Sequence, residues 1–235
     1  MADDSGPQSG SQRGNGHGAD VAFRRRRDAP RRRDARANLA RLVEVARDLA
    51  AERGLIEVSV DEIAARAGVG KGTVYRAFGD KAGIAAALLD DDERLLQEAI
   101  LAGPPPLGHG AAPLERVRAF ARAYTEFLDR NVDLLLAADR GAPAARHRSG
   151  AYAFWLAHLR GVLAAHGGGE HPPADAGTGT DHHGDAEGAA HAVLALLDPE
   201  LFFHLRRDSG YPLARVAALV DAAVRGIVGQ ALAGD

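Results

Sequence analysis

The sequence predicts an all-α fold, and three observations lead to this prediction. Apolar side chains recur at intervals of three and four residues along several long segments. No segment shows the apolar–polar alternation that is typical of a β-strand. Gly and Pro are concentrated between the periodic segments, where they mark loops. We therefore expect helices joined by turns and no sheet.

Composition limits the class of protein. A chain of 235 residues with 46% hydrophobic and 26% charged residues is typical of a globular protein with an ample core. It has no Cys, which excludes disulfides and thiolate metal sites and suits a reducing cytoplasm. No apolar run reaches the ~18 residues of a membrane span, and the N-terminus lacks the apolar stretch of a secretory signal. We expect a cytoplasmic protein without a membrane partner.

Charge is distributed unevenly along the chain. The net charge is −3, yet residues 1–80 carry a balance of +3 and the remainder a balance of −6. Such asymmetry suggests one end that faces nucleic acid and one that does not.

Residues 1–33 are poor in apolar side chains and are expected to form a disordered basic arm. Two clusters of arginines flank Pro30, which interrupts any continuous helix. They are either part of a solvated tail or an arm that follows the DNA backbone or enters the minor groove. The arginines are Arg24, Arg25, Arg26, Arg27, Arg31, Arg32 and Arg33.

The next segments predict three helices in a domain over residues 34–83. Residues 34–53 carry an apolar stripe, and Gly54 ends the first helix. The stretch from Ser59 to Lys81, SVDEIAARAGVGKGTVYRAFGDK, then predicts two short helices joined by a tight turn at Gly68. Ser59 and Glu62 have the spacing of a capping box at the start of the first of them. The pattern is that of a helix-turn-helix, although an ordinary helical hairpin would share the spacing.

The residues of this stretch resemble the DNA-binding motif of TetR-family transcriptional regulators. The similarity covers IAARAGVGKGTVYRAFGDK without gaps and is strong over about 38–89. The one departure is Ala50, where the family usually has an aromatic residue. GVGKGT is also similar to a phosphate-binding loop, but Gly72 stands where that loop needs Ser or Thr, and Ala65 where it needs its first Gly.

Side-chain chemistry and the resemblance together assign roles within the motif (residues 59–78) and just beyond it. Lys71, Tyr75 and Lys81 are expected to contact phosphates, and Thr73 and Arg76 to reach base edges. Gly72 would let the backbone approach the DNA, and Ser59 is included as a DNA-facing residue.

Residues 84–235 are expected to form a larger helical domain for effector binding and dimerisation. Helices are predicted over 80–100, 113–129, 131–138, 149–166, 189–207 and 212–232, with an internal restart at 198–200. In the family that the motif resembles, the first of these links the two domains. Five residues of this domain are either core or the lining of an effector pocket: Tyr124, Phe127, Tyr152, Trp155 and His158.

Residues 167–187 read as a flexible low-complexity loop. His166, His171, His182 and His183 lie in or beside it with no helical ligand spacing. A metal site there is conceivable, but we expect a solvated loop, no metal and no cofactor.

The broad apolar arc of residues 212–232 must be covered. The resemblance implies a homodimer through the C-terminal helices (about 189–232); a helix buried within one subunit is the alternative. The function expected is a DNA-binding regulator, most often a repressor, that binds a palindromic double-stranded operator and responds to an unknown small-molecule effector. An architectural DNA-binding protein and a helical enzyme are the rivals, but no carboxylate pair, activated nucleophile or metal cluster favours an enzyme.

Overall fold

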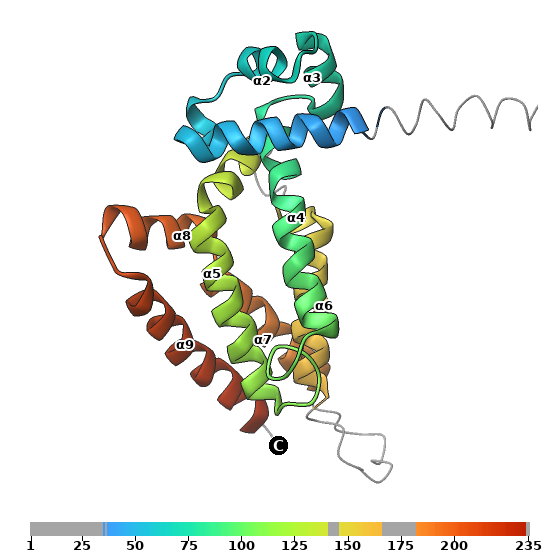
Figure 1. The fold of residues 1–235 in the computed structure, drawn as a ribbon. Coiled ribbons are helices and arrows are strands. Elements are labelled where there is room, and N and C mark those ends of the chain that lie inside the picture. The colour runs from blue at the N-terminus through green and yellow to red at the C-terminus, as the bar shows by residue number, and fades with distance from the viewer. Residues whose placement is uncertain (1–34, 36, 141–145, 166–181, 234–235) are drawn as a thin grey trace, which may run out of the picture.

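All the regular secondary structure in the described residues is helical, as the sequence predicts. The computed structural model describes residues 35, 37–140, 146–165 and 182–233. It forms a small helical domain on top of a larger one (Figure 1). Over these residues no helix is long and apolar enough to cross a membrane.

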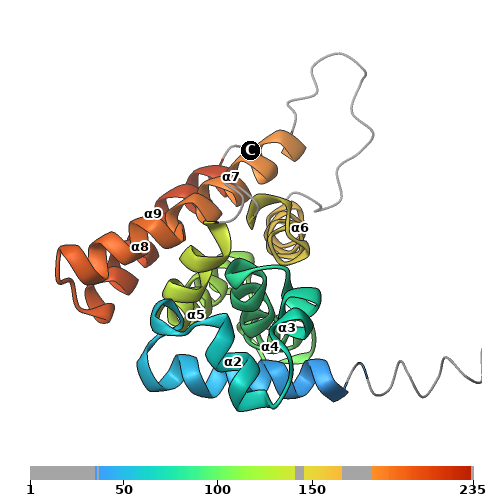
Figure 2. The same ribbon diagram turned by 90° about the horizontal axis from the view of Figure 1, so that it is seen from above.

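The small domain is built from three helices and the start of a fourth. A helix over 37–53 is followed by a 3₁₀ turn, η1 (Leu55–Glu57), and by helices α2 (Val60–Ala67) and α3 (Lys71–Phe78). Viewed from above, these helices surround the beginning of α4 (Lys81–Ala102) (Figure 2). Leu42, Leu49, Ile63, Val74 and Ile84 form the centre of its core, each no more than 3% exposed.

Helix α4 joins the two domains without a break. Ile84 and Leu88 lie in the small core, whereas Leu89 and Ile100 lie in the larger one. Helix α5 (Pro113–Asp139) packs along α4, and its Ala137 is buried against the small core. Both helices therefore connect the small domain to the larger domain.

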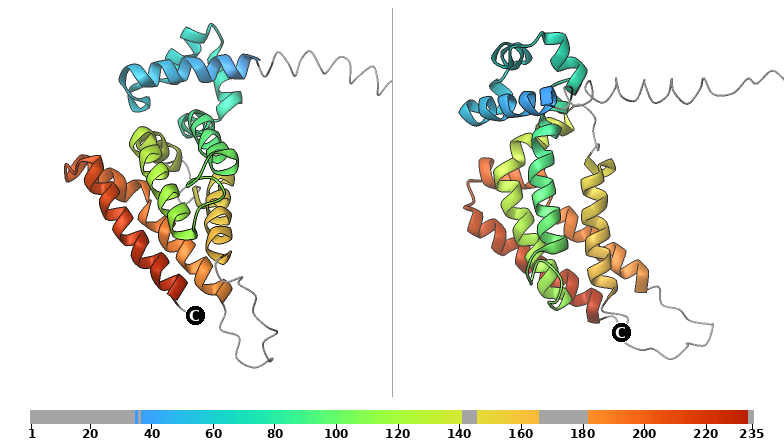
Figure 3. Two further views of the ribbon diagram at one scale, coloured as in Figure 1. Left: turned by 60° about the horizontal axis from the view of Figure 1, so that its bottom comes forward. Right: turned by 45° about the vertical axis from the view of Figure 1, so that its right-hand side comes forward.

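The larger core lies between α5 and the helices that follow it. These are α6 (Gly150–Ala164), α7 (His182–Leu196), α8 (Pro199–Phe203) and α9 (Leu213–Ala233), with 3₁₀ turn η2 (Arg146–Arg148) and π-helical turn η3 (His204–Asp208). Phe120, Phe127, Trp155 and Leu159 are almost fully buried within it. Figure 3 shows α9 along the outside of this domain, where it packs on α5 and α7.

Three helix boundaries differ from the sequence prediction. The predicted break near residue 130 is absent, because Asn131 is accommodated inside α5: its amide donates to Asp92 Oδ2 (2.8 Å) and to the carbonyl of Phe127 (3.1 Å). Helix α7 begins at His182, so the predicted loop over 167–187 ends earlier than expected. The helix predicted to continue to residue 207 becomes the π-helical turn η3.

The predicted restart at Asp198 is confirmed, since its side chain caps α8 by accepting from the Leu201 N–H (2.9 Å).

Candidate nucleic-acid interface

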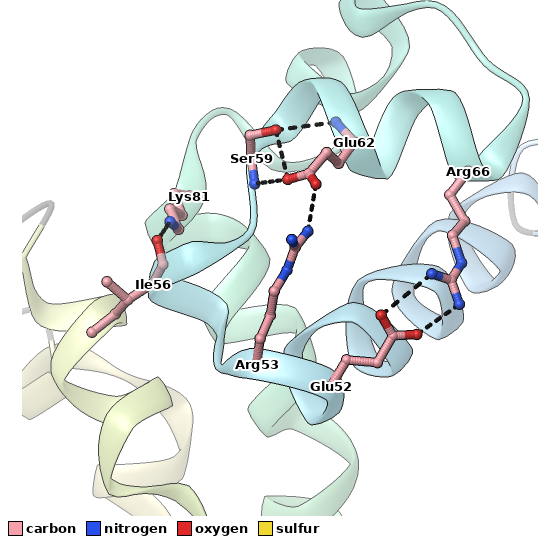
Figure 4. Close-up of polar contacts among 7 residues, drawn as sticks. All are labelled: Glu52, Arg53, Ile56, Ser59, Glu62, Arg66 and Lys81. Carbon is pink, nitrogen blue, oxygen red and sulfur yellow. Dashed lines mark hydrogen bonds and ion pairs between the residues drawn. The ribbon is translucent and has the colours of Figure 1, made fainter.

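Ser59 and Glu62 begin α2 with a reciprocal cap, which confirms the predicted capping box. The Glu62 N–H donates to Ser59 Oγ (3.2 Å), and the Ser59 N–H donates to Glu62 Oε2 (3.0 Å). The Ser59 hydroxyl also donates to Glu62 Oε2 (3.0 Å) (Figure 4). Ser59 is thus occupied locally, and its contact with DNA stays a prediction.

Two ion pairs attach α2 to the helix over 37–53 (Figure 4). Arg53 donates to Glu62 Oε1, and Arg66 lies 2.8 Å from Glu52 Oε1. The hydrogen bonds from the Ser59 backbone and from Arg53 lower the pKa of Glu62 from 4.5 to about 2. The carboxylate of Glu62 therefore holds together the cap and the contact between two helices.

Replacing Glu62 by Gln should weaken the small domain in a pH-dependent way. Because folding lowers the pKa of Glu62, its contribution is fully present above pH 4.5 and is lost as the pH falls toward 2. The difference in unfolding free energy between wild type and Glu62→Gln should be largest near neutral pH and shrink over that window. Chemical denaturation at several pH values measures this difference. Glu44→Gln, at an exposed position of the same domain, is the control, and a difference independent of pH would contradict the assignment.

The turn between α2 and α3 depends on a left-handed glycine. Gly68 has φ 67° and ψ 35°, and its N–H returns to the carbonyls of Ala64 and Ala65. Such a conformation costs little only for Gly. Helix α3 then begins at Lys71, as predicted, with Gly70 as its N-cap.

One face of α3 is buried and the other is open. Val74 is 1% exposed and anchors the helix in the small core. Lys71, Gly72, Tyr75 and Arg76 are exposed on the outer face, and Thr73 is half-buried beside them. A Cβ added at Gly70 or Gly72 would meet no atom within 4 Å. Packing within the protein therefore does not require glycine at either position.

Three polar side chains of α3, those of Lys71, Thr73 and Arg76, already have partners within the chain. Lys71 Nζ lies 2.8 Å from Asp61 Oδ1, and this hydrogen bond raises the pKa of Lys71. Arg76 Nε donates to the carbonyl of Gly72 (3.2 Å), and its Nη2 to Thr73 Oγ1 (3.4 Å). The structure thus brings Thr73 and Arg76 together, with the guanidinium folded back along its own helix.

Lys81 has an internal partner that the sequence did not indicate. Its ammonium donates to the carbonyl of Ile56 in η1 (Figure 4), at the start of a helix whose N-cap is Asp80. This contact gives a structural reason for a cation at an unfavourable helix end. Lys81 is half-buried, and its contact with a phosphate stays a prediction.

Sequence reasoning also missed the number of acidic residues in this domain. Residues 37–81 contain seven Arg or Lys and seven Asp or Glu, so the folded domain has no formal excess of positive charge. The excess lies in residues 1–36, with nine Arg against five Asp. The seven predicted arm arginines, Arg24–Arg27 and Arg31–Arg33, lie outside the described residues.

The five residues predicted for an effector pocket do not form a single lining. Tyr124 and Tyr152 line a cavity of about 260 Å³, whereas Phe127, Trp155 and His158 are not among its lining residues. Phe127 and Trp155 are 1% and 2% exposed and belong to the core, as the alternative interpretation held. His158 instead lies beside Phe120, with the ring centroids 5.7 Å apart and the ring planes tilted by 46°. Burial, with Arg116 nearby, lowers the pKa of His158 to about 4, so it is neutral at pH 7.

The cavity is completed by residues that the sequence did not single out. We call it the tyrosine cavity; besides the two tyrosines it is lined by Arg146, His147, His191, Leu194, Ala195, Leu197 and Asp198. They come from η2, from α7 and from the residues before α8. No local pattern in the sequence joins these three segments.

Comparison with known proteins agrees with the resemblance found in the motif. Residues 42–88 match the family model of bacterial regulatory proteins of the tetR family. An HTH-type transcriptional regulator of Staphylococcus aureus (strain USA300) is 38% identical over 61 residues, which is 26% of this chain and 33% of that protein. The chain thus matches about a third of the length of this curated relative.

Two solved structures share the whole architecture. A TetR-family transcriptional regulator from Streptomyces coelicolor aligns with a TM-score of 0.55 and 22% identity, over 83% of this chain and 97% of the other. A SmeT–triclosan complex aligns with a TM-score of 0.53 and 18% identity, over 81% and 90% of the two chains. The fold of both domains therefore agrees with the motif match at the N-terminal end. Residues 42–88 thus match the tetR family of bacterial regulatory proteins, as the sequence predicts, and the chain as a whole shares the fold of a TetR-family regulator of known structure.

Proposed function

We propose that the protein is a homodimeric transcriptional repressor, working in the bacterial cytoplasm, that leaves a palindromic operator when a small molecule binds its larger domain. The observation that carries this proposal is the outer face of α3, which presents Lys71, Tyr75 and Arg76 next to glycines with open space above them. A helix of this kind can enter the major groove with its N-terminal residues toward the bases.

On this proposal the residues of α3 divide by chemistry. Lys71 and Tyr75 contact phosphates and fix the register, while Arg76 and Thr73 reach base edges. Lys71 is paired with Asp61 on the surface, and such exposed pairs are weak in water, so a phosphate can replace the carboxylate. Arg76 would exchange its contacts with Gly72 and Thr73 for a guanine edge.

Replacing Arg76 by Ala should relax sequence selection at one base pair of each half-site. The loss of a bidentate contact to guanine is expected to cost about 1–3 kcal/mol on the preferred base and little on the others. Binding to a series of single-base operator variants measures this. Arg41→Ala, at an exposed position of the helix over 37–53, is the matched control. Unchanged selectivity in Arg76→Ala would refute a base-reading role.

The arm adds a sequence-tolerant contribution. Because residues 37–81 have no formal excess of positive charge, the arginines of residues 1–33 are the main source of attraction to the phosphate backbone. They follow the backbone or enter the minor groove beside the site that α3 reads.

The outward face of α9 supports the dimer. Leu219 is 50% exposed there, beside five exposed small residues: Ala214, Ala218, Ala222, Gly226 and Gly229. The exposed cations of this helix have partners within the chain, since Arg225 pairs with Asp221 and Arg215 lies over the Tyr211 ring. Leu201 of α8 is also 45% exposed. Apolar and small side chains on one face allow close packing of a second copy about a two-fold axis. The two recognition helices would then lie about 34–36 Å apart, one turn of DNA.

An effector would act by differential affinity for two forms of the dimer. The tyrosine cavity supplies a place for it, and SmeT, a protein similar in fold, is found in complex with triclosan. Helices α4 and α5 would connect the cavity to the small domain, since each contributes residues to both hydrophobic cores.

Fluorescence anisotropy tests this function with purified protein and labelled DNA from just upstream of its own gene. A regulator should bind tightly in the presence of excess random DNA and keep much of that affinity as salt is raised. Binding removed equally by competitor and by salt would instead support the architectural DNA-binding alternative.

A further inference from the structure

Arg146 is the only charged donor that lines the tyrosine cavity, and its position is set by two carboxylates. Its Nη2 donates to Asp198 Oδ2 (2.7 Å), and its backbone N–H donates to Asp139 Oδ1 (3.2 Å). Asp139 Oδ2 lies 3.9 Å from Nη1. The side chain is only 17% exposed, and it lies between the tyrosine cavity and a second cavity of about 610 Å³ that Asp139 also lines.

One donor of this guanidinium is unused. Arg146 Nη1 is buried and has no hydrogen-bond partner among the residues that the structure describes. An unsatisfied buried donor is costly, and any acceptor that reaches it recovers that cost. Tyr124 lines the same cavity, and burial raises its pKa, so its hydroxyl stays protonated and can donate as well.

The charges at this wall exclude one class of ligand. Two carboxylates, Asp139 and Asp198, lie within 4 Å of the single guanidinium, so the group as a whole carries an excess negative charge. A carboxylate or phosphate ligand would meet this excess after losing its water. A neutral oxygen acceptor meets two donors without that penalty. The remaining wall combines the apolar side chains of Leu194, Ala195 and Leu197 with the rings of Tyr152, His147 and His191, and the Tyr152 hydroxyl lies 3.4 Å from His191 Nδ1.

We propose that the tyrosine cavity binds a small, neutral, largely apolar molecule through a carbonyl-type oxygen that accepts hydrogen bonds from Arg146 Nη1 and the Tyr124 hydroxyl. This inference rests on the proposed function, for which it names the chemical class of the effector. The position of Arg146 is also suited to linking ligand binding to the arrangement of the helices. Arg146 joins Asp139, at the end of α5 near the small core, to Asp198, the N-cap of α8. A ligand that engages Arg146 therefore acts where the connecting helix meets a helix of the proposed dimer surface.

Three probes of similar size test the proposal: acetophenone, ethylbenzene and benzoate, titrated by ligand-observed NMR against the full-length protein. Acetophenone should bind, and its affinity should fall about tenfold in Arg146→Met and in Tyr124→Phe, while that of ethylbenzene stays the same in both. Arg140→Met, next to the same turn but not on the cavity lining, should change neither. Tyr124→Phe retains the ring in the core and guards against a folding defect in Arg146→Met.

Benzoate tests whether the cavity disfavours an anionic ligand. It should bind at least about tenfold more weakly than acetophenone in the wild type. Asp198→Asn removes one negative charge and leaves an amide oxygen to cap α8. It should reduce the difference in affinity between acetophenone and benzoate. Benzoate as the tightest probe, no binding by acetophenone, or acetophenone affinity indifferent to both Arg146→Met and Tyr124→Phe would overturn the inference.

Failure of this inference is separable from failure of the proposed function. DNA binding is measured on the same preparations by the anisotropy assay above. Site-specific DNA binding together with any of the three negative results refutes the effector class alone. A protein that selects no DNA site refutes the regulator itself, whatever the probes do.

Discussion

An Ala222→Arg substitution on α9 is expected to produce a monomer and to weaken operator binding by at least about 100-fold. Ala222 is exposed on the outward face that also carries Ala218, Leu219 and Gly226. In a two-fold dimer the new guanidinium would be buried near its own copy, without a partner, at a point where the neighbouring exposed residues Ala218 and Gly226 are small. Loss of the second subunit removes the second half-site contact, and linked contacts of this kind contribute about 10²–10⁴ in affinity.

Sedimentation velocity gives the oligomeric state of this variant, and anisotropy gives its DNA affinity. Ala157→Arg, at an exposed position of α6 away from that face, is the matched control and should remain dimeric with wild-type affinity. Should Ala222→Arg still sediment as a dimer and bind the operator normally, the dimer surface lies elsewhere.

Deleting residues 1–33 is expected to flatten the salt dependence of DNA binding. The folded part of the DNA-binding domain has equal numbers of acidic and basic residues, so we expect the arm to hold most of the charges that release counterions. Each phosphate contact adds about 0.9 to the slope of log K against log salt, and we expect the slope to fall by roughly 3 or more. Affinity at 50 mM salt should drop by on the order of 10²-fold, with little change in the preferred site.

A variant with all seven arm arginines changed to Lys separates charge from geometry. It should keep the salt slope, because the charge is unchanged, and lose affinity mainly on sites with a narrow minor groove, where Arg is favoured. A deletion that leaves the slope at its wild-type value would show that the arm does not touch DNA.

The features of the fold that depend on local sequence were predictable. The capping box at Ser59 and Glu62 and the left-handed turn at Gly68 act through neighbouring residues. The sequence therefore predicts the positions of α2 and α3 along the chain, and the motif in these helices is the part that resembles the TetR family. The break predicted near Asn131 failed because its side chain is satisfied by Asp92, which is 39 residues away.

The candidate sites were predictable only where one helix carries them. Tyr75 and Arg76 follow from the face of α3. By contrast, the pairing of Lys71 with Asp61 and of Lys81 with Ile56 depends on how separate elements meet. The position of Arg146 at the cavity could not be predicted from the sequence. It depends on contacts with Asp139 and Asp198, which only the fold brings close to Arg146.

Selection from a random double-stranded DNA library, with the full-length protein, tests the central claim most directly. We expect enrichment of one near-palindromic sequence whose half-sites lie about one helical turn apart, because a two-fold dimer places both α3 helices in successive major grooves. The same selection with Arg76→Ala should lose preference at one position in each half-site. A library that shows no enriched sequence after several rounds, although the protein binds DNA, would contradict a site-specific regulator.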